Sequence, residues 1–510
     1  MNDARVAVAA GSRIAADAGA EIAGQGGNAV DAAIAAALVS LCTDIGVVSP
    51  GGGAFVAVLP PGGEPLIIDG YAEMPGRAGP AARPESAWEV RFNYMGETRQ
   101  RIGFGAAAVP GALAALASAS RQFGRLSWCA VMAPAIRWTE RGAPLTGGAA
   151  EYLLYTHAAI YSWHPDSYRI VHDAAGRPRE AGDVVRVPHL SDSLQEIAER
   201  GVEVLYRGPL GQRIAAAVQE AGGLLGEPDL VSYRAVNRLP ITRPLRDWQI
   251  ATNPVPSVGG SCLAAMLDLL EKQPAEQFDA RAVAHHARVQ HAVLSYRRRN
   301  MDGAGARLPA AAERLLRLAY EGQQDLVLES PATIHVSAAD DRGCACAITS
   351  SAGYGSGAIA PGTGIWLNNS LGEVDLLTRG LAGTPPGSRL ASNMAPTVAR
   401  RRDGEVLAIG TPGASRITTT LAQVLQQHIR FGLALEDAVR HPRLHVELLP
   451  RGPAVSFEPG LPVGELGEFD LRPFTAPSMY FGGVQVASWS PKSGLFAVGD
   501  SRRSGCIAYG

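Results

Sequence analysis

Lysine is almost absent from the sequence, and this shortage limits the chemistry open to the protein. Only Lys272 and Lys492 occur among 510 residues, whereas arginine is abundant. Enzymes that form Schiff bases need a lysine placed in the active site, so the composition argues against that class. The formal net charge of −2 also argues against binding to nucleic acid or to an acidic membrane surface.

Cysteine is scarce as well, and its spacing indicates neither disulfides nor zinc. The six cysteines include no CxxC pair. Cys344 and Cys346 alternate along a predicted strand, so they share a face and cannot easily bridge each other. A zinc site would need a second pair of ligands, which the sequence does not offer. We therefore expect buried free thiols and no metal site.

A long apolar run and a basic leader are both missing. The most apolar stretch, residues 29–42, is interrupted by Asp31 and is too short to span a bilayer, so it is predicted to be a buried helix with Asn28 as its N-cap. The opening residues, MNDARVAVAAGSR, lack the basic segment and apolar core of a signal peptide. We expect a soluble, cytoplasmic protein.

The sequence does contain a helix-rich first part and a strand-rich last part. Strands are expected at 54–59 and 65–69, and short strands resume near residue 332. Because no internal repeat or low-complexity linker occurs, this order predicts one compact α+β domain, a layered α/β sandwich, rather than regular βαβ alternation. The helices are predicted over 12–23, 29–42, much of 111–225, 261–271, 281–299 and 417–430.

Some familiar patterns have ordinary explanations. The GYGSG segment at 353–357 is like a dinucleotide loop, but a strand-like turn follows it, so no helix start is available for a phosphate. His286 and His291 share a predicted helix, yet five residues separate them and they do not form a metal-binding face. No GxSxG elbow and no P-loop occur. No cofactor is predicted.

Two stretches could carry nucleophilic chemistry. Thr333 opens a predicted strand, turn and strand, and its hydroxyl becomes a useful nucleophile only when a base takes its proton. The segment GTPGASR is predicted to be a strand end, a tight turn and a helix start. The N–H groups of Gly413 and Ala414 would point outward there, as an oxyanion requires. Considered singly, each stretch is more often structural than catalytic.

Together with further segments, these stretches resemble the γ-glutamyltranspeptidase family of N-terminal-nucleophile hydrolases, in order and over nearly the whole chain. The resemblance implies a four-layer αββα sandwich and identifies Thr333-Ile334-His335 as the nucleophile segment. The other matching segments are GGNAVDAAIAAAL from Gly26, VPGALAAL from Val109, LYRGPLGQRIA from Leu205, GGLLGEPDLVSY from Gly222, GTGIWLNNSLGE from Gly362, SNMAPTV from Ser392, GTPGASRITT from Gly410 and FGGVQ from Phe481.

The resemblance implies self-cleavage before Thr333, giving a large chain of residues 1–332 and a small chain of 333–510. Cleavage would free an α-amine with an ordinary pKa of about 7.7–8.0, which can take the proton of the hydroxyl on the same residue. Acyl transfer to Thr333 Oγ1 would give an ester, with the oxyanion held by Gly413 and Ala414. Water or an amine would then release the acyl group.

The resemblance also implies which residues assist Thr333 and touch the substrate. Thr349 and Ser351 both fall near the second threonine of the family, which hydrogen-bonds the nucleophile, and Ser351 is the closer match. Ser392 and Asn393 occupy the places of a Ser-Ser pair that contacts the α-carboxylate of the substrate. Asn369 and Glu373 fall in the segment that receives its α-amino group. Thr349 is the remaining implied substrate contact.

The glutamyl clamp, the arginine that binds the α-carboxylate of a glutamyl substrate in the family, is not kept in this sequence. An arginine should directly precede Glu73, but that position is Ala72. Loss of a guanidinium fork against a carboxylate is not a conservative change. Arg77 lies in the same loop and is the candidate replacement.

Three functions therefore stay open. The first is a hydrolase or acyltransferase for a γ-glutamyl or related small acyl amide. The second is a specialised homologue in actinobacterial secondary metabolism that hydrolyses another amide or a carbon–carbon bond. The third is an unprocessed binding protein without catalysis. The expected partners are a small-molecule substrate and the protein's own two chains, with a higher homo-oligomer left open.

Overall fold

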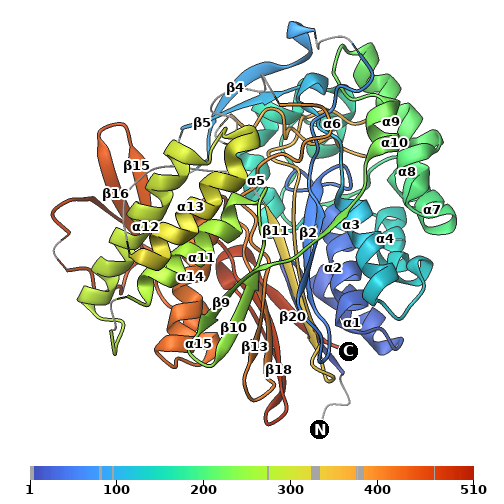
Figure 1. Ribbon diagram of the computed structural model, residues 1–510. Helices are drawn as coiled ribbons and strands as arrows, with labels where there is room; N and C mark the ends of the chain where they lie inside the picture. Colours follow the sequence, from blue (N-terminus) through green and yellow to red (C-terminus); the bar gives the residue numbers. More distant parts are fainter. Residues whose placement is uncertain are drawn as a thin grey trace.

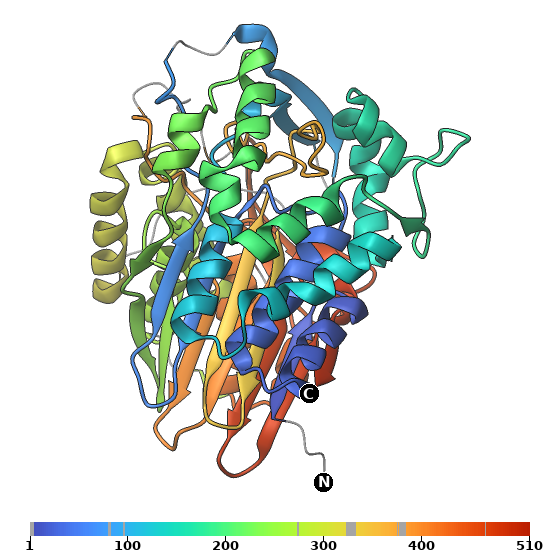
Figure 2. The ribbon, with the colours of Figure 1, turned by 90° about the vertical axis from the view of Figure 1, so that its right-hand side faces the viewer.

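Two large antiparallel sheets face each other at the centre of the protein, and helices cover both outer faces (Figures 1 and 2). The computed structural model describes residues 5–79, 83–94, 97–272, 275–322, 333–374, 376, 384–464 and 466–510. The four-layer αββα sandwich predicted from the sequence is confirmed.

The first sheet has seven strands and places distant parts of the chain side by side. The strand that follows Thr333, β11, lies between the first strand of the chain and its hairpin partner β12. In order across the sheet, the strands are β20 (Cys506–Tyr509), β1 (Val6–Ala10), β11 (Ile334–Asp340), β12 (Ala345–Ser351), β2 (Gly53–Leu59), β3 (Leu66–Gly70) and β8 (Val236–Arg238).

The second sheet has six strands and packs against the first. Small side chains fill the space between the sheets, among them Ala57, Ala347 and Ala408, so the two backbones approach closely. The order is β19 (Gly494–Gly499), β18 (Gln485–Ser490), β14 (Val406–Gly410), β13 (Thr397–Arg401), β10 (Trp248–Thr252) and β9 (Ile241–Leu245).

Helix α2 (Ala29–Thr43) packs on the outer face of the first sheet and explains the apolar run of the sequence. Every residue of α2 is buried, as expected for a helix that is apolar on all sides. Asn28 caps it by accepting from the amides of Val30 and Asp31, and the Asp31 carboxylate accepts from the Asn28 amide at 3.0 Å. The predicted N-cap is confirmed.

The remaining helices divide between the two outer layers (Figure 1). Those over the first sheet and its edge are α1 (Arg13–Gly24), α3 (Ala112–Phe123), α4 (Trp128–Arg141), α5 (Gly147–Thr156), α6 (Pro165–Val171), α7 (Leu190–Arg200), α8 (Glu203–Arg207), α9 (Pro209–Glu220) and α10 (Glu227–Ser232). Those over the second sheet are α11 (Val258–Leu270), α12 (Ala280–Asn300), α13 (Leu308–Glu321), α14 (Arg416–Leu425) and α15 (Leu435–Arg440).

Smaller elements complete the structure. The predicted helix at 417–430 is α14 followed by one π-helical turn, Gln426–Arg430, and α15 was not predicted. Three minor sheets are formed by β15 (Leu444–Leu449), β16 (Gly452–Phe457) and β17 (Asp470–Pro473), by β4 (Trp88–Asn93) and β5 (Glu97–Ile102), and by β6 (Ala143–Pro144) and β7 (Val184–Val185).

The cysteines form no disulfide. Four of them are buried, as predicted, whereas Cys129 is exposed and Cys506 is partly exposed. Over the part of the chain that the structure describes, no cluster of three or more His, Cys, Asp or Glu side chains could hold a metal ion. Within the same residues, no helix combines the length and apolarity needed to cross a bilayer.

Candidate active site

Thr333 directly precedes β11 at an end of the first sheet where neighbouring strands align. Ile334 pairs with Ser350 of β12, so Thr333, one residue earlier, lies across from Ser351. Ser351 in turn pairs with Gly53 of β2. Thr333 and Ser351 are both buried. The register thus brings the predicted nucleophile and its predicted hydrogen-bonding partner into one row.

The Thr333 and Ser351 side chains face the second sheet. His335 Nδ1 lies 2.8 Å from Thr349 Oγ1, so these two side chains share a face. A Cβ added at Gly410 of β14 would lie 2.3 Å from the His335 ring, which places that face against the second sheet. Since side chains alternate along a strand, the same face carries Thr333 and Ser351.

His335 is unsuited to act as the base for Thr333. Burial lowers its pKa to about 3, so the ring is neutral at physiological pH. Both ring nitrogens are occupied, Nδ1 by Thr349 and Nε2 by Ser337 Oγ at 2.9 Å. The Thr349 hydroxyl is thereby engaged with His335, two residues along the strand from Ser351.

The predicted oxyanion turn follows β14. Gly413 has a φ of 131° and Ala414 a φ of 63°, after which α14 begins at Arg416. A left-handed alanine is uncommon and points to a functional constraint. Within the described ranges, neither the Gly413 nor the Ala414 amide donates to an acceptor. Pro412, the preceding residue, lines the same pocket as Thr333.

The segment Phe481–Val484 supports this turn. Gly483 N donates to Thr411 Oγ1 at 2.8 Å, and Thr411 Oγ1 donates to the Pro412 carbonyl at 2.8 Å. A Cβ added at Gly482 would meet Thr411 Oγ1 at 2.5 Å, so only glycine allows this approach.

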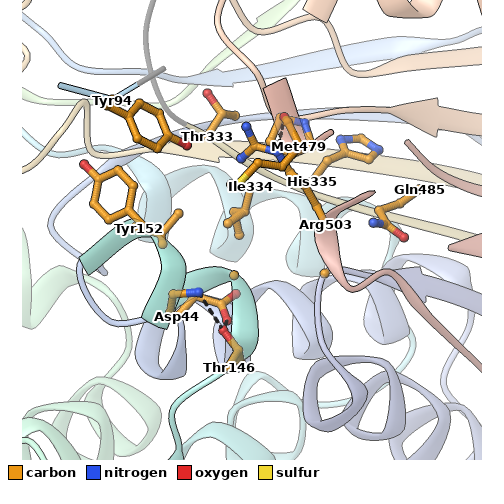
Figure 3. A pocket seen from close by; sticks show the side chains of 15 residues that line it. Asp44, Tyr94, Thr146, Tyr152, Thr333, Ile334, His335, Met479, Gln485 and Arg503 are labelled. Carbon is orange, nitrogen blue, oxygen red and sulfur yellow. Dashed lines mark hydrogen bonds between the residues drawn. The ribbon is translucent and has the colours of Figure 1, made fainter. Parts of the chain in front are cut away.

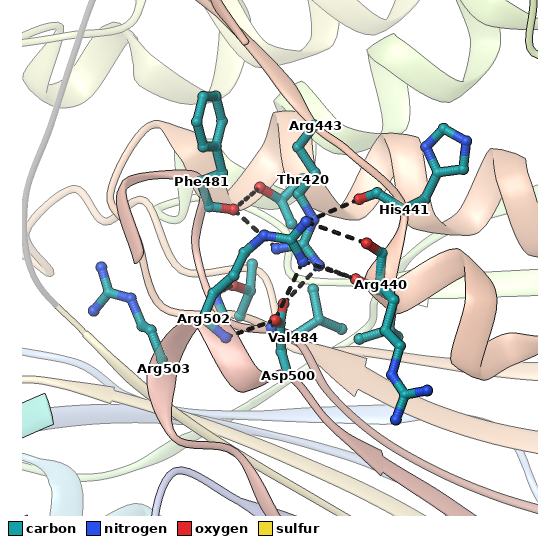
Figure 4. Close-up of polar contacts among 12 residues, drawn as sticks. Thr420, Arg440, His441, Arg443, Phe481, Val484, Asp500, Arg502 and Arg503 are labelled. Carbon is teal, nitrogen blue, oxygen red and sulfur yellow. Dashed lines mark hydrogen bonds and ion pairs between the residues drawn. The ribbon is translucent and has the colours of Figure 1, made fainter. Parts of the chain in front are cut away.

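A buried ion network fixes the supporting segment from behind (Figure 4). Arg443 donates to the Phe481 carbonyl at 3.1 Å and pairs with Asp500 at 2.6 Å. Asp500 also accepts from the Val484 amide at 3.0 Å, and Arg502 lies 3.3 Å from its other oxygen. Arginine and aspartate can both be buried here because each satisfies the other.

We call the cavity beside Thr333 the Thr333 pocket (Figure 3). Tyr94 and Tyr152 form one wall, and Met479 and Arg503 lie opposite. Tyr94 is 6% exposed, and its hydroxyl has no partner in the part of the chain that is described. A buried hydroxyl without a partner is costly and is available to a ligand.

Asp44 lies at the base of the Thr333 pocket. It caps the end of α2 and accepts from Thr146 Oγ1 at 3.1 Å. Burial raises its pKa to about 6, against hydrogen bonds from Thr146 and Ser40 that lower it.

Polar groups also gather on the other side of Thr333, around Tyr71. Gly53, the partner of Ser351, lies so close to Tyr71 that an added Cβ would be 2.8 Å from the ring. Burial and the charge of Glu373 raise the pKa of Tyr71 well above its ordinary value, and the nearby hydroxyls of Ser370 and Ser392 oppose this rise. We call Tyr71, Ser370, Glu373 and Ser392 the Tyr71 cluster; all are buried.

Two other predicted substrate contacts have different surroundings. Asn369 accepts from Tyr354 N at 2.8 Å and donates to the Arg101 carbonyl at 3.2 Å, so its amide is engaged within the protein. Gly353 must be glycine, because an added Cβ would lie 2.1 Å from Asn369 Oδ1. Asn393 is buried next to Ser392 of the Tyr71 cluster.

Arg77 is held by acidic side chains. Its guanidinium donates to Glu73 at 2.8 Å and lies 3.7 Å from Asp229. Arg389 pairs with the other Glu73 oxygen at 3.0 Å. Ala72 itself is buried beside Gly53. Arg77 does not line the Thr333 pocket as described, so its role in substrate binding stays a prediction.

Thr333 and Ser351 lie in one row, and Pro412, directly before the Gly413–Ala414 turn, lines the same pocket as Thr333; the catalytic roles of these residues stay predictions. Four residues near Thr333 were not predicted from the sequence: Tyr71, Asp44, Tyr94 and Arg503. Only Tyr71 had a detectable signal, since it adjoins the altered clamp position. The others come from segments that no motif joins to Thr333. Ala332, on the other side of the predicted cleavage point, is not among the described residues.

Comparison with known proteins identifies similar sequences and folds. The family described as gamma-glutamyltranspeptidase matches residues 15–510. A glutathione hydrolase proenzyme of Pseudomonas aeruginosa is 31% identical over 463 residues, which cover 84% of this chain and 80% of that protein. The acylase ACY 1 proenzyme of Pseudomonas sp. strain V22 is 29% identical, with 83% and 79% covered. A crystal structure of cephalosporin acylase from Bacillus halodurans has the same fold, with a TM-score of 0.79, 24% identity, and 99% and 96% covered.

Proposed function

The chain belongs to the gamma-glutamyltranspeptidase family, and from this premise we propose that it is a self-processing hydrolase or acyltransferase whose nucleophile is Thr333. Its relatives are glutathione hydrolases and acylases, so the protein is an enzyme of the hydrolase and transferase type. Two relatives carry the word proenzyme in their names, which supports maturation by cleavage.

One observation carries the proposal. Thr333 and Ser351 lie across from each other on the face that meets the second sheet, and the Gly413–Ala414 turn after β14 presents two amides that donate to no acceptor among the described residues. Nucleophile, assisting hydroxyl and oxyanion donors are the minimum set for acyl transfer. The neutral, fully bonded His335 leaves the base to come from the α-amine that cleavage before Thr333 would free.

The proposed reaction proceeds in two halves. The α-amine of Thr333 takes the proton of its own Oγ1, which attacks the substrate carbonyl, while the Gly413 and Ala414 amides bind the oxyanion. The amine then gives the proton to the departing nitrogen, and an ester on Thr333 remains. Water or an acceptor amine, deprotonated in the same way, releases the acyl group.

The Tyr71 cluster is the proposed acyl site. Ser392 and Glu373 could meet polar groups of an acyl chain of γ-glutamyl type, with Tyr71 beside them. Asn369 and Asn393 adjoin this site and shape it, and Thr349 orders β12 through His335.

A second candidate is a specialised hydrolase for another amide or a carbon–carbon bond. This candidate is favoured by the residues at the position of the glutamyl clamp. Ala72 stands where the family has arginine, and Arg77 already forms an ion pair with Glu73. A cation that is already paired offers little to a substrate carboxylate.

Mass spectrometry and turnover test the proposal together. We expect two chains split between Ala332 and Thr333, and a single chain for Thr333→Ala. Wild-type protein that stays uncut after long incubation would contradict self-processing. Cleaved protein that fails to hydrolyse γ-glutamyl-p-nitroanilide would select the second candidate. The two chains would remain associated after cleavage.

A further inference from the structure

The Arg503 end of the Thr333 pocket and the Tyr71 cluster lie on opposite sides of β11, whereas the Tyr94–Tyr152 wall of the pocket contacts Tyr354, shortly after β12. In the first sheet β12, β2 and β3 lie on one side of β11, and β1 and β20 lie on the other. The Tyr71 cluster adjoins β12, β2 and β3. Gly11, directly after β1, and Arg503, shortly before β20, both line the Thr333 pocket. A substrate held at Thr333 therefore meets two separate sets of side chains.

Arg503 is held in place by its stem and by one nitrogen. Nε donates to the Met479 carbonyl at 3.2 Å. The stem rests on Gly483, where an added Cβ would lie 2.5 to 3.0 Å from three Arg503 carbons. The side chain extends toward Thr333, as Figure 3 shows. The guanidinium is therefore positioned in the pocket before any ligand arrives, which lowers the entropic cost of binding.

No acidic side chain of the described ranges forms an ion pair with Arg503. Its neighbour Arg502 pairs with both Glu458 and Asp500. Asp44, the acidic member of the pocket, is bonded to Thr146 and lies outside ion-pair distance of Arg503. Two terminal nitrogens of a fixed guanidinium thus remain for an anion in a half-buried site, which is the geometry that suits a carboxylate.

We propose that Arg503 is a specificity residue that binds a carboxylate on the leaving-group part of the substrate. The inference rests on the proposed function, because it takes the Tyr71 cluster as the acyl site and Thr333 as the point of attack. The departing amine then extends toward β1 and β20, where Arg503 lies. The preferred substrates are amides whose amine component carries a carboxylate, such as an amino acid or a short peptide.

Two chromogenic substrates that differ by one carboxylate on the leaving group test this. They are γ-glutamyl-p-nitroanilide and γ-glutamyl-3-carboxy-4-nitroanilide. We expect the wild-type enzyme to favour the carboxylated substrate in kcat/KM, and Arg503→Gln to reduce that preference about tenfold, chiefly through KM. Arg503→Lys should fall between them, because it keeps the charge and loses the fork. Both kcat/KM values are measured on the same preparation, so uncleaved protein lowers them equally and leaves their ratio unchanged.

A matched control removes one positive charge elsewhere. Arg451 is exposed and pairs with Asp470, away from the Thr333 pocket, and Arg451→Gln should leave the ratio unchanged. An equal ratio in wild type and Arg503→Gln would overturn the proposal, as would an equal loss on both substrates.

A binding measurement separates this inference from the proposed function. If wild-type protein cleaves neither compound, the γ-glutamyl assignment fails while Arg503 can still be examined. Calorimetry with the leaving groups alone, 5-amino-2-nitrobenzoate and 4-nitroaniline, should show a preference for the benzoate that falls about tenfold in Arg503→Gln. Equal preference in both proteins would refute the role of Arg503 whatever the acyl group is.

Discussion

His335 and Thr349 face each other across β11 and β12, with 2.8 Å between Nδ1 and Oγ1. The contact lies two residues from the Thr333–Ser351 row, against Gly410 of the second sheet. It joins the strands that present both hydroxyls, and it depends on the imidazole being neutral. The pH dependence of folding should report on it.

We predict that His335 makes the protein less stable as the pH falls. Its pKa is 6.5 in an unfolded chain and about 3 in the fold, so the unfolded state gains a proton first as the pH falls below 6.5. This costs about 5 kcal/mol of unfolding free energy between pH 6.5 and 3. His335→Gln should remove that part of the slope in denaturant titrations. Burial lowers the pKa of His286 to about 3 as well, so the difference from wild type is the quantity to measure.

Asp44 should have the opposite effect. Burial raises its pKa from 3.8 to about 6, so the folded state keeps a proton that the unfolded state loses. Stability is then full below pH 4 and falls by about 3 kcal/mol as the pH rises through 6. Asp44→Asn should be the more stable protein at pH 7 and show no advantage at pH 3.5. Asp192→Asn, at an exposed position, is the control, and an unchanged profile for Asp44→Asn would contradict the assignment.

Ser351→Ala should impair catalysis through the loss of one hydroxyl opposite Thr333. Removing a hydrogen bond to a reacting group costs about 1–3 kcal/mol, so kcat should fall about 10- to 100-fold and Ser351→Thr should recover it. Ser350 provides the control, because its hydroxyl lies on the other face and donates to the Gly53 carbonyl. If Ser350→Ala lowered kcat equally, the effect would be one of folding rather than of position.

The sequence was sufficient for the fold because its signals were local and agreed with one another. The Asn28 cap, the mostly apolar helix predicted over 29–42 and the paired strands predicted at 54–59 and 65–69 are each readable within a few residues, and the structure has all three. The row of Thr333 and Ser351 follows from the register of the β11–β12 hairpin, whereas the sequence implied this pair only through the family resemblance.

The Thr333 pocket was not predictable, because its walls come from distant segments. Arg503 reaches Thr333 only after β20, β1 and β11 have become neighbours in the sheet, and Tyr94 and Tyr152 come from the end of β4 and from α5. The ion pair between Arg77 and Glu73 could not be predicted either. Their spacing of four residues is visible in the sequence, but the loop that turns them together is not.

Tyr94→Phe should weaken substrate binding more than it slows the reaction. The hydroxyl is buried in the Thr333 pocket without a partner among the described residues, so a substrate group that bonds to it recovers about 1 kcal/mol. We expect KM to rise about fivefold with kcat little changed. Tyr155, which is 38% exposed and touches the Tyr94 ring, supplies the control variant Tyr155→Phe. A fall in kcat without a change in KM would count against a binding role.

Thr411 couples the ion network to the Gly413–Ala414 turn. Its hydroxyl accepts from Gly483 N and donates to the Pro412 carbonyl, so it joins the segment held by Arg443 to the residue before Gly413. Thr411→Val keeps the shape of the side chain and removes both bonds. The turn should loosen, and because the oxyanion forms only during the reaction, kcat should fall about tenfold while KM changes little.

Two further variants show whether Thr411 acts through the turn or only through stability. Thr418→Val also removes a buried threonine hydroxyl, one that bonds to the Ser415 carbonyl within α14, and should lower the unfolding free energy without the loss of kcat. Thr411→Ser retains the hydroxyl and should restore kcat even though it leaves a small cavity. If kcat instead follows the unfolding free energy across all three variants, Thr411 is a structural residue and the turn does not depend on it.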